Sequence, residues 1–136
     1  MEHEVDLAAL VDVALNLSAA SHYLDRLSGQ VLPAAEVAAR CGPAVAVQER
    51  YVRVPPVAQR LRLDDARDFV TTLPDDVLRR RVEKLLRGPR APWAFEHELQ
   101  RWPAVADTWR AWERVCATAR ILGWLGRIGY PFTYPE

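Results

Sequence analysis

The chain has 136 residues, of which 50% are apolar, and its formal net charge is zero. The apolar fraction and the five Trp, four Tyr and three Phe residues exclude a disordered chain, and no apolar run approaches the roughly 20 residues of a membrane-spanning helix. The length predicts a single domain over residues 1–136. The acidic start Met1-Glu2-His3-Glu4 and two cysteines without motif spacing predict a cytoplasmic protein with free thiols.

Two helices and three short strands are predicted within the first 54 residues. Apolar residues recur at helical spacing over 5–15. Residues 20–32 predict a hairpin that turns at Gly29, because glycine adopts a positive φ at little cost. A short helix over 34–40 and an alternating strand over 50–54 follow. Three such strands need a helical layer over them to be stable.

The rest of the chain predicts helices only. Asp64 is the expected N-cap of the first of them. The chain then restarts at Pro74, and Asp75 and Asp76 lie in the first turn of the next helix, where the helix dipole favours acidic side chains. Gly88 is expected to end this second helix. Its predicted inward-facing residues are Val77, Leu78, Val82, Leu85 and Leu86.

Two further helices complete the chain. Pro92 opens a short helix that should bury Phe95 and Leu99, and a long helix runs from about Ala104 to Arg127. The apolar stripe of the long helix is predicted to be Val105, Trp109, Trp112, Cys116 and Ala119. These elements predict an α+β fold, with a short antiparallel three-stranded meander packed against a helical layer and a mostly helical C-terminal half.

Short motifs follow one another along most of this chain in a recognisable order. They are Tyr23-Leu24-Asp25 with Ser28-Gly29-Gln30-Val31, Arg50-Tyr51-Val52-Arg53-Val54-Pro55, Asp68-Phe69-Val70, Leu73-Pro74-Asp75, Leu85-Leu86-Arg87-Gly88, Phe95, Leu99, Trp109, Trp112, Trp124-Leu125 and Gly129-Tyr130. In this order they resemble the bacterial uncharacterised protein family 0158. The resemblance implies a small bacterial cytosolic α+β protein, and it implies no activity.

The chain departs from that family after the second predicted helix of its C-terminal half. The family tends to have the stretch Gly-x-Gly-Ala-Phe-Arg-Arg-Phe-Lys there, whereas this chain has residues 88–96, Gly-Pro-Arg-Ala-Pro-Trp-Ala-Phe-Glu. A second glycine and two adjacent basic residues are missing. A family role that rests on this basic loop is therefore not carried over to this chain.

The candidate catalytic side chains form no recognisable constellation. Glu96, His97 and Glu98 are consecutive, and adjacent helix positions point about 100° apart, so a solvated helix face fits them better than a metal site. His22 stands alone in a predicted strand, and no base is placed next to Cys41. The scattered glycines give no phosphate-binding loop. We expect no catalytic residue, no metal site and no cofactor, and an enzyme of unknown type remains the last alternative.

Charge is unevenly distributed along the chain. Residues 1–49 carry seven acids and two bases, whereas residues 50–136 carry eleven acids and sixteen bases. Arginine supplies 17 of the 18 basic residues. This bias also fits a genome that prefers arginine codons, and charge runs commonly solvate a helix face.

Basic residues nevertheless gather on the predicted helix over 77–86 and at its exit. Positions 80, 84 and 87 fall on one helix face, with Arg81 nearby, and further arginines lie just upstream between residues 50 and 62. If these surfaces adjoin, they form a patch that faces phosphate or carboxylate groups. If internal acids pair with the arginines, the patch is neutralised.

Exposed aromatic residues are the second candidate feature. Trp93 is an expected apolar anchor, and so is Phe132, because a short C-terminal tail is hard to bury in so small a domain. We predict a non-enzymatic binding or adaptor protein that contacts an acidic partner or a second copy of the chain. Nucleic-acid binding through the same residues is the alternative. The predicted binding residues are Arg53, Arg80, Arg81, Lys84, Arg87, Arg90, Trp93 and Phe132.

Overall fold

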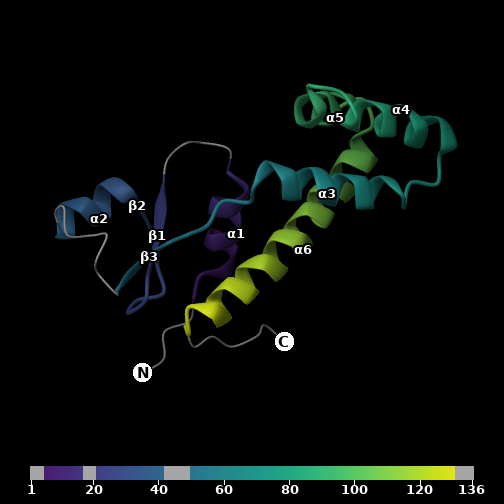
Figure 1. Ribbon diagram of the computed structural model, residues 1–136. Coiled ribbons are helices and arrows are strands. Elements are labelled where there is room, and N and C mark those ends of the chain that lie inside the picture. The colour runs from purple at the N-terminus through teal and green to yellow at the C-terminus, as the bar shows by residue number, and fades with distance from the viewer. Residues whose placement is uncertain (1–4, 17–20, 42–49, 131–136) are drawn as a thin grey trace. The chain divides into compact units, whose positions relative to one another are not determined.

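The computed structural model describes residues 5–16, 21–41 and 50–130 (Figure 1). Its elements are α1 (Leu7–Leu15), β1 (His22–Asp25), β2 (Val31–Pro33), α2 (Ala34–Cys41), β3 (Tyr51–Arg53), α3 (Gln59–Val70), α4 (Asp76–Leu86), α5 (Ala91–Leu99) and α6 (Pro103–Arg127). The α+β class, with an antiparallel three-stranded sheet and a mostly helical C-terminal half, is confirmed.

Internal contacts divide the chain into two compact units. The sheet unit consists of residues 1–56 and 117–136, and the helical unit consists of residues 57–116. Helix α6 contributes residues to both units. The expected single domain therefore stays a prediction.

The hairpin of β1 and β2 forms around Gly29. Tyr23 lies opposite Leu32 in an antiparallel register. Two backbone hydrogen bonds of 2.8 Å close the turn, from the Asp25 N–H to the Gln30 carbonyl and from the Gly29 N–H to the Asp25 carbonyl. Gly29 has a φ of 76°, a conformation that a side chain would strain. The predicted hairpin is thus confirmed.

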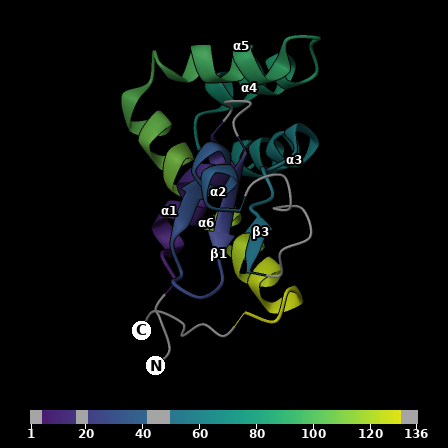
Figure 2. The same ribbon diagram turned by 90° about the vertical axis from the view of Figure 1, so that its left-hand side faces the viewer.

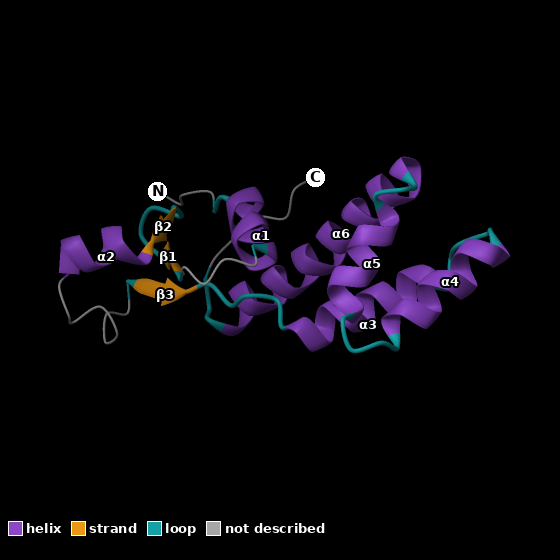
Figure 3. Cartoon of the chain, turned by 90° about the horizontal axis from the view of Figure 1, so that it is seen from above, coloured by secondary structure: helices purple, strands orange, loops and turns teal. Residues whose placement is uncertain are grey.

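The central strand of the sheet is β1, because the strand order is β2-β1-β3. β3 pairs antiparallel with β1, and Leu24 lies opposite Val52. The predicted meander, in which β3 would pair with β2, is wrong. Helix α2 begins directly after β2, so no short turn joins β2 to a third strand, and β3 reaches the other edge of β1 (Figure 3).

Asp25 ends β1 as a buried carboxylate that is only 1% exposed. Its two oxygens accept hydrogen bonds of 2.9 Å from the Arg50 guanidinium, and one oxygen also accepts from the Leu27 N–H at 3.0 Å. Hydrogen bonding from Arg50 is the main reason why the pKa of Asp25 lies well below its usual range. This ion pair joins the end of β1 to the residue that precedes β3.

Helix α2 covers the strands and completes a small core. Leu32, Val37 and Tyr51 are buried together, and Tyr23 and Cys41 pack against them. Figure 2 shows α2 in front of β1, and α2 contacts both β1 and β2. The expected helical cover of the sheet is thus present in this unit.

The hairpin turn is also tied to other parts of the sheet unit. Asp6 caps α1 by accepting a hydrogen bond of 3.0 Å from the Ala9 N–H, and the Asp6 N–H donates to the Gly29 carbonyl at 3.2 Å. The Arg26 guanidinium donates to the Ile128 carbonyl at 3.2 Å. These bonds join the start of α1 and the chain after α6 to the same turn.

In the helical unit, α3 begins earlier than expected. Its N-cap is Ala58, which makes no side-chain cap hydrogen bond. Asp64 lies exposed within the helix and pairs with Arg67 at 3.2 Å, so the predicted N-cap at Asp64 is wrong. The reason is that residues 59–63 are Gln, Arg and Leu, which are good helix formers, and Leu63 packs against the core.

The predicted start of α4 is confirmed. The Asp75 carboxylate accepts hydrogen bonds from the Val77 N–H at 2.9 Å and from the Leu78 N–H at 3.0 Å. Leu78 and Val82 are buried, whereas Val77 is 79% exposed. The predicted inward position of Val77 is therefore wrong, because it lies about 100° around the helix from Leu78.

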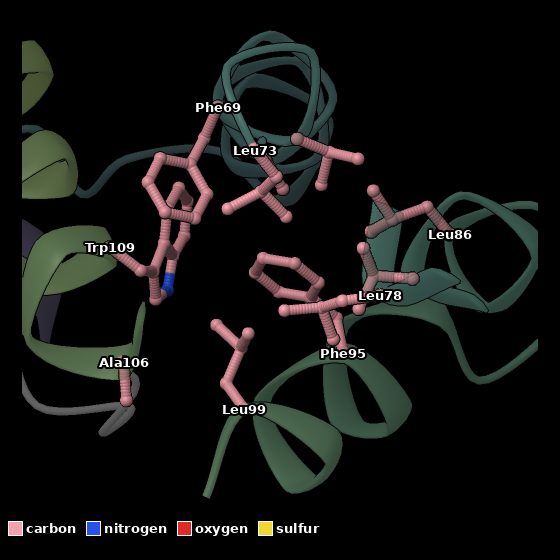
Figure 4. Packing of buried hydrophobic residues seen from close by; sticks show 11 residues of the cluster. Phe69, Leu73, Leu78, Leu86, Phe95, Leu99, Ala106 and Trp109 are labelled. Carbon is pink, nitrogen blue, oxygen red and sulfur yellow. The ribbon is translucent and has the colours of Figure 1, made fainter. Parts of the chain in front are cut away.

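Buried residues from α3 to α6 form one core in the helical unit (Figure 4). The Trp109 ring lies 5.1 Å from the Phe95 ring and 5.4 Å from the Phe69 ring, between centroids. The Trp109 indole N–H donates to the Glu96 carboxylate at 2.9 Å. The core consists of Ala66, Phe69, Val70, Leu73, Leu78, Val82, Leu86, Phe95, Leu99, Ala106 and Trp109. The predicted burial of Phe95 and Leu99 is confirmed.

Helix α6 begins at Pro103, next to the predicted start, and Trp109 is buried as predicted. Val105 and Trp112 pack against the core as predicted, whereas Ala119 is exposed, so only its place in the predicted apolar stripe is wrong. The buried positions of the C-terminal half of the helix are Ala117, Ile121, Trp124 and Leu125. Within the described residues, no helix is both long enough and apolar enough to cross a membrane.

Candidate binding groove between α4 and α5

Several of the arginines that the sequence suggested for a basic patch form ion pairs with nearby carboxylates. Arg50 pairs with Asp25, and Arg62, Arg79 and Arg81 each lie within 4.0 Å of at least one carboxylate oxygen. In contrast, four cations on α4 and at its exit have no ion pair with a carboxylate of the described residues. They are Arg80, Lys84, Arg87 and Arg90.

An open groove of about 530 Å³ lies between α4 and the start of α5, within the helical unit. Three of its lining side chains are cationic, none is acidic, and the other lining residues are apolar or glycine. The groove, here called the α4–α5 groove, is lined by Arg81, Lys84, Leu85, Gly88, Pro89, Arg90 and Ala94. The structure thus brings together three of the predicted binding residues.

Helical periodicity explains why these residues share one groove. Positions 81, 84 and 85 follow the spacing i, i+3 and i+4 and form one stripe along α4, and Gly88 continues it into the turn after the helix. Arg90, the N-cap residue of α5, lies one turn before Ala94, and its carbonyl accepts a hydrogen bond of 2.9 Å from the Ala94 N–H. Because Pro89 cannot continue a helix, the chain turns there and α5 returns beside α4 (Figure 1).

Arg81 is held at the groove by a buried carboxylate of α5. Its Nε atom lies 2.8 Å from Glu98 Oε1, and the Glu98 side chain is 8% exposed. Arg101 lies 3.8 Å from the other Glu98 oxygen. Removing the Arg81 charge would leave a buried carboxylate with only this more distant partner, which is costly. Arg81 therefore stabilises the helical unit as well as lining the groove.

Arg87 lines a different hollow, on the α3 side of α4. This smaller hollow has a volume of about 230 Å³ and also contains Arg67 and Glu83. The predicted face of residues 80, 84 and 87 is therefore divided, because Lys84 lines the α4–α5 groove. Arg80 is exposed and belongs to the lining of neither hollow.

Trp93 is 63% exposed and stacks on His97, with ring centroids 4.9 Å apart. Neither ring is among the residues that line the α4–α5 groove, although Trp93 directly precedes the lining residue Ala94 in α5. Arg53 is exposed in β3, which belongs to the sheet unit, and Phe132 lies outside the described residues. The binding roles of Arg53 and Phe132 stay predictions.

The three consecutive titratable residues of α5 have three different partners. Glu96 accepts from the Trp109 indole, His97 stacks on Trp93, and Glu98 pairs with Arg81. In residues 5–16, 21–41 and 50–130, no group of three or more His, Cys, Asp and Glu side chains is arranged to hold a metal ion.

One further titratable group lies between α3 and α6. Burial is the main cause that raises the pKa of Glu113, and the neighbouring carboxylates of Glu96 and Asp65 raise it further. The Arg62 guanidinium, 4.0 Å away, acts in the opposite direction. Neither Arg62 nor Glu113 lines the two hollows described above, so this pair is part of the helix packing.

Sequence reasoning missed the buried position of Glu98 and the apolar part of the groove. Glu98 is 6% exposed, so its prediction on a solvated helix face is wrong. Its spacing was the available signal, because Glu98 follows Phe95 by one helical turn and precedes Leu99, and both are buried. Leu85 is half-buried and lines the groove, although the apolar pattern assigned it to the core.

The groove includes the stretch in which the chain departs from the family pattern that it resembles. Gly88, Pro89, Arg90 and Ala94 all lie in that stretch. The resemblance therefore implies nothing about the groove. Membership of that family stays an expectation. Comparisons of this chain with models of known protein families, with curated proteins and with solved structures find no match.

Proposed function

We propose that this chain is a non-enzymatic binding or adaptor protein that contacts an acidic partner through the α4–α5 groove. One observation carries the proposal: three cations and no carboxylate line the groove, and Lys84 and Arg90 have no ion pair within the described part of the chain. A cytoplasmic location belongs to the same proposal.

The position of Arg90 supports a role outside the fold. Arg90 is the N-cap residue of α5 and makes no side-chain cap hydrogen bond. A cation at a helix N-terminus is repelled by the helix dipole, and Ser, Thr, Asp or Asn would stabilise this position better. Lys84, in contrast, lies in the last turn of α4, where the dipole favours a cation. Arg90 therefore stands where local stability disfavours it, as functional residues often do.

Trp93 supplies an apolar contact beside these charges. Its 63% exposure is high for the largest apolar side chain, and exposed Trp next to Arg is a composition typical of binding hot spots. We therefore include Trp93 as the anchor at the edge of the groove.

The acidic residues of the N-terminal part have partners within the chain, which favours a partner other than a second copy. Asp25 pairs with Arg50, Glu36 pairs with Arg40, and Asp6 caps α1. Asp12, the remaining acid that the structure describes between residues 5 and 41, also has an interaction partner. Each of these four acids thus has a partner within its own chain, which leaves none of them unpaired for the groove of a second copy.

Nucleic-acid binding remains the second candidate because of the stacked Trp93–His97 pair. Proteins that bind single-stranded nucleic acids combine cations with exposed aromatic rings on which bases stack. Such binding weakens steeply as salt rises, because each neutralised phosphate releases counterions. Binding to mixed DNA or RNA that weakens steeply as salt rises would therefore favour this second candidate.

Reversing both unpaired groove charges is expected to weaken binding to an acidic partner. The double variant Lys84→Glu, Arg90→Glu should bind a labelled polyglutamate peptide about tenfold more weakly, since each contact between exposed charges contributes about 0.2–1 kcal/mol and reversal replaces attraction with repulsion. Fluorescence anisotropy measures this affinity.

The control is Arg110→Glu, which reverses one exposed cation on α6 and changes the net charge by −2, against −4 for the double variant. Arg110 is exposed and pairs locally with Asp107 at 2.9 Å. This control should leave the affinity within about twofold of the original, because screening limits the effect of a distant surface charge. Equal affinities for the double variant and the control would overturn the proposal, provided that circular dichroism shows both to be folded.

A further inference from the structure

We infer that the α4–α5 groove binds a short acidic peptide segment with an aliphatic side chain between its carboxylates, an inference that rests on the proposed binding function. The groove combines a cationic edge with an aliphatic floor, and each part selects one feature of the peptide. Lys84 and Arg90 select carboxylates by charge complementarity. Leu85, Pro89 and Ala94 offer apolar surface that an aliphatic side chain would cover.

The fold does not require a glycine at position 88, where the floor of the groove is open. The glycines with positive φ in the described residues are Gly29 and Gly129, so the backbone conformation does not demand glycine at position 88. A Cβ atom there would meet the Leu85 carbonyl oxygen at 3.4 Å, which is an ordinary van der Waals contact. The missing side chain therefore keeps space in the groove without being needed for the turn.

The lining favours a peptide over a nucleic acid. None of the residues that line it is aromatic, so a base bound in the groove would find no ring there on which to stack. Its polar side chains are Arg81, Lys84 and Arg90, cations that pair with phosphates and with carboxylates, so the aliphatic floor decides between the two kinds of ligand. An aliphatic floor contributes to binding only when an apolar group covers it, which an aliphatic amino acid does.

Two labelled synthetic peptides test the inference directly. In one, glutamates flank a single leucine on both sides, and in the other an alanine replaces the leucine. The folded 136-residue chain is expected to bind the leucine peptide about tenfold more tightly, because the larger side chain covers more of the apolar floor. A single-stranded oligodeoxynucleotide of equal net charge is the third probe.

A variant that fills the floor should remove this preference. Ala94→Trp places a large side chain in the groove, so its affinities for the leucine and alanine peptides should become equal within about twofold. Ala111→Trp, at an exposed position of α6, is the matched control and should keep the preference. Gly88→Leu fills the same floor from the turn and serves as a second blocking variant if Ala94→Trp does not fold.

The possible outcomes separate this inference from the proposed function. Equal binding of the two peptides by the original chain would overturn the inference but leave the acidic-partner proposal standing. A preference that persists in both blocking variants would overturn the inference in the same way. Tighter binding of the oligodeoxynucleotide, or no binding of any probe, would overturn both.

Discussion

Replacing Trp109 with alanine is expected to lower the free energy of unfolding by about 4 kcal/mol, the typical cost of removing a large aromatic side chain from a packed core. Trp109 is 3% exposed, and its ring contacts both Phe69 and Phe95 (Figure 4). The substitution removes these contacts and leaves a cavity among α3, α5 and α6. Urea denaturation followed by far-UV circular dichroism measures the loss.

Two further variants show which part of Trp109 carries this stability. Trp109→Phe keeps an aromatic ring but loses the 2.9 Å hydrogen bond to Glu96, so we expect a smaller cost of about 1–2 kcal/mol. Trp93→Ala removes a tryptophan that is 63% exposed and should cost less than about 0.5 kcal/mol. Equal losses for Trp109→Ala and Trp93→Ala would contradict the packing described here.

Local signals predicted those elements whose formation depends on neighbouring residues. Asp75 caps α4 because its carboxylate reaches N–H groups only two and three residues further along the chain. Gly29 turns the hairpin because its own backbone conformation requires a residue without a Cβ atom. Such features are readable from sequence, since no distant part of the chain decides them.

Contacts between distant residues decided the features that sequence reasoning missed. The order of the strands depends on which edge of β1 the chain reaches after α2, and the hydrophobic pattern of β3 is the same for either edge. The sequence predicts the start of α3 at Asp64, because aspartate is a common N-cap residue. Aspartate also occurs within helices, as Asp64 does in α3. Packing of Leu63 on the core extends that helix beyond its apparent start.

The same distinction applies to the arginines. Arg50 meets its carboxylate 25 residues away in sequence, and Arg81 meets Glu98 across the α4–α5 packing. The density of arginines predicted a basic surface, but only the fold separates paired arginines from those that remain for a partner. Lys84 and Arg90 belong to the second kind, and for this reason the proposed function rests on them.

Asp25→Asn is expected to lower the free energy of unfolding of the sheet unit by about 3 kcal/mol at neutral pH, the usual cost of breaking a buried ion pair by removing one charge. The Asp25 carboxylate accepts two hydrogen bonds from Arg50 and one from Leu27. An asparagine amide has one oxygen, and its NH₂ group would face a guanidinium donor. Urea denaturation and hydrogen exchange of the Leu27 amide measure the effect.

The exposed pair of Asp64 and Arg67 supplies the matched control. Both side chains are 54% exposed, and the charge change in Asp64→Asn is the same as in Asp25→Asn. Because water screens the Asp64–Arg67 pair, its loss should cost less than about 0.5 kcal/mol. Similar costs for the two variants would mean that burial of Asp25 adds nothing to its ion pair.

The dependence on pH gives the sharper test of the Asp25–Arg50 pair. Folding lowers the pKa of Asp25, so the stability that this carboxylate contributes is fully present above its unfolded pKa of about 4 and is lost as the pH falls toward its folded value. Asparagine resembles the protonated side chain and cannot titrate. The difference in unfolding free energy between the original chain and Asp25→Asn should therefore be constant from about pH 7 to pH 5 and then shrink below about pH 4. A difference that stays constant down to about pH 2 would show that the Asp25 charge does not stabilise the fold.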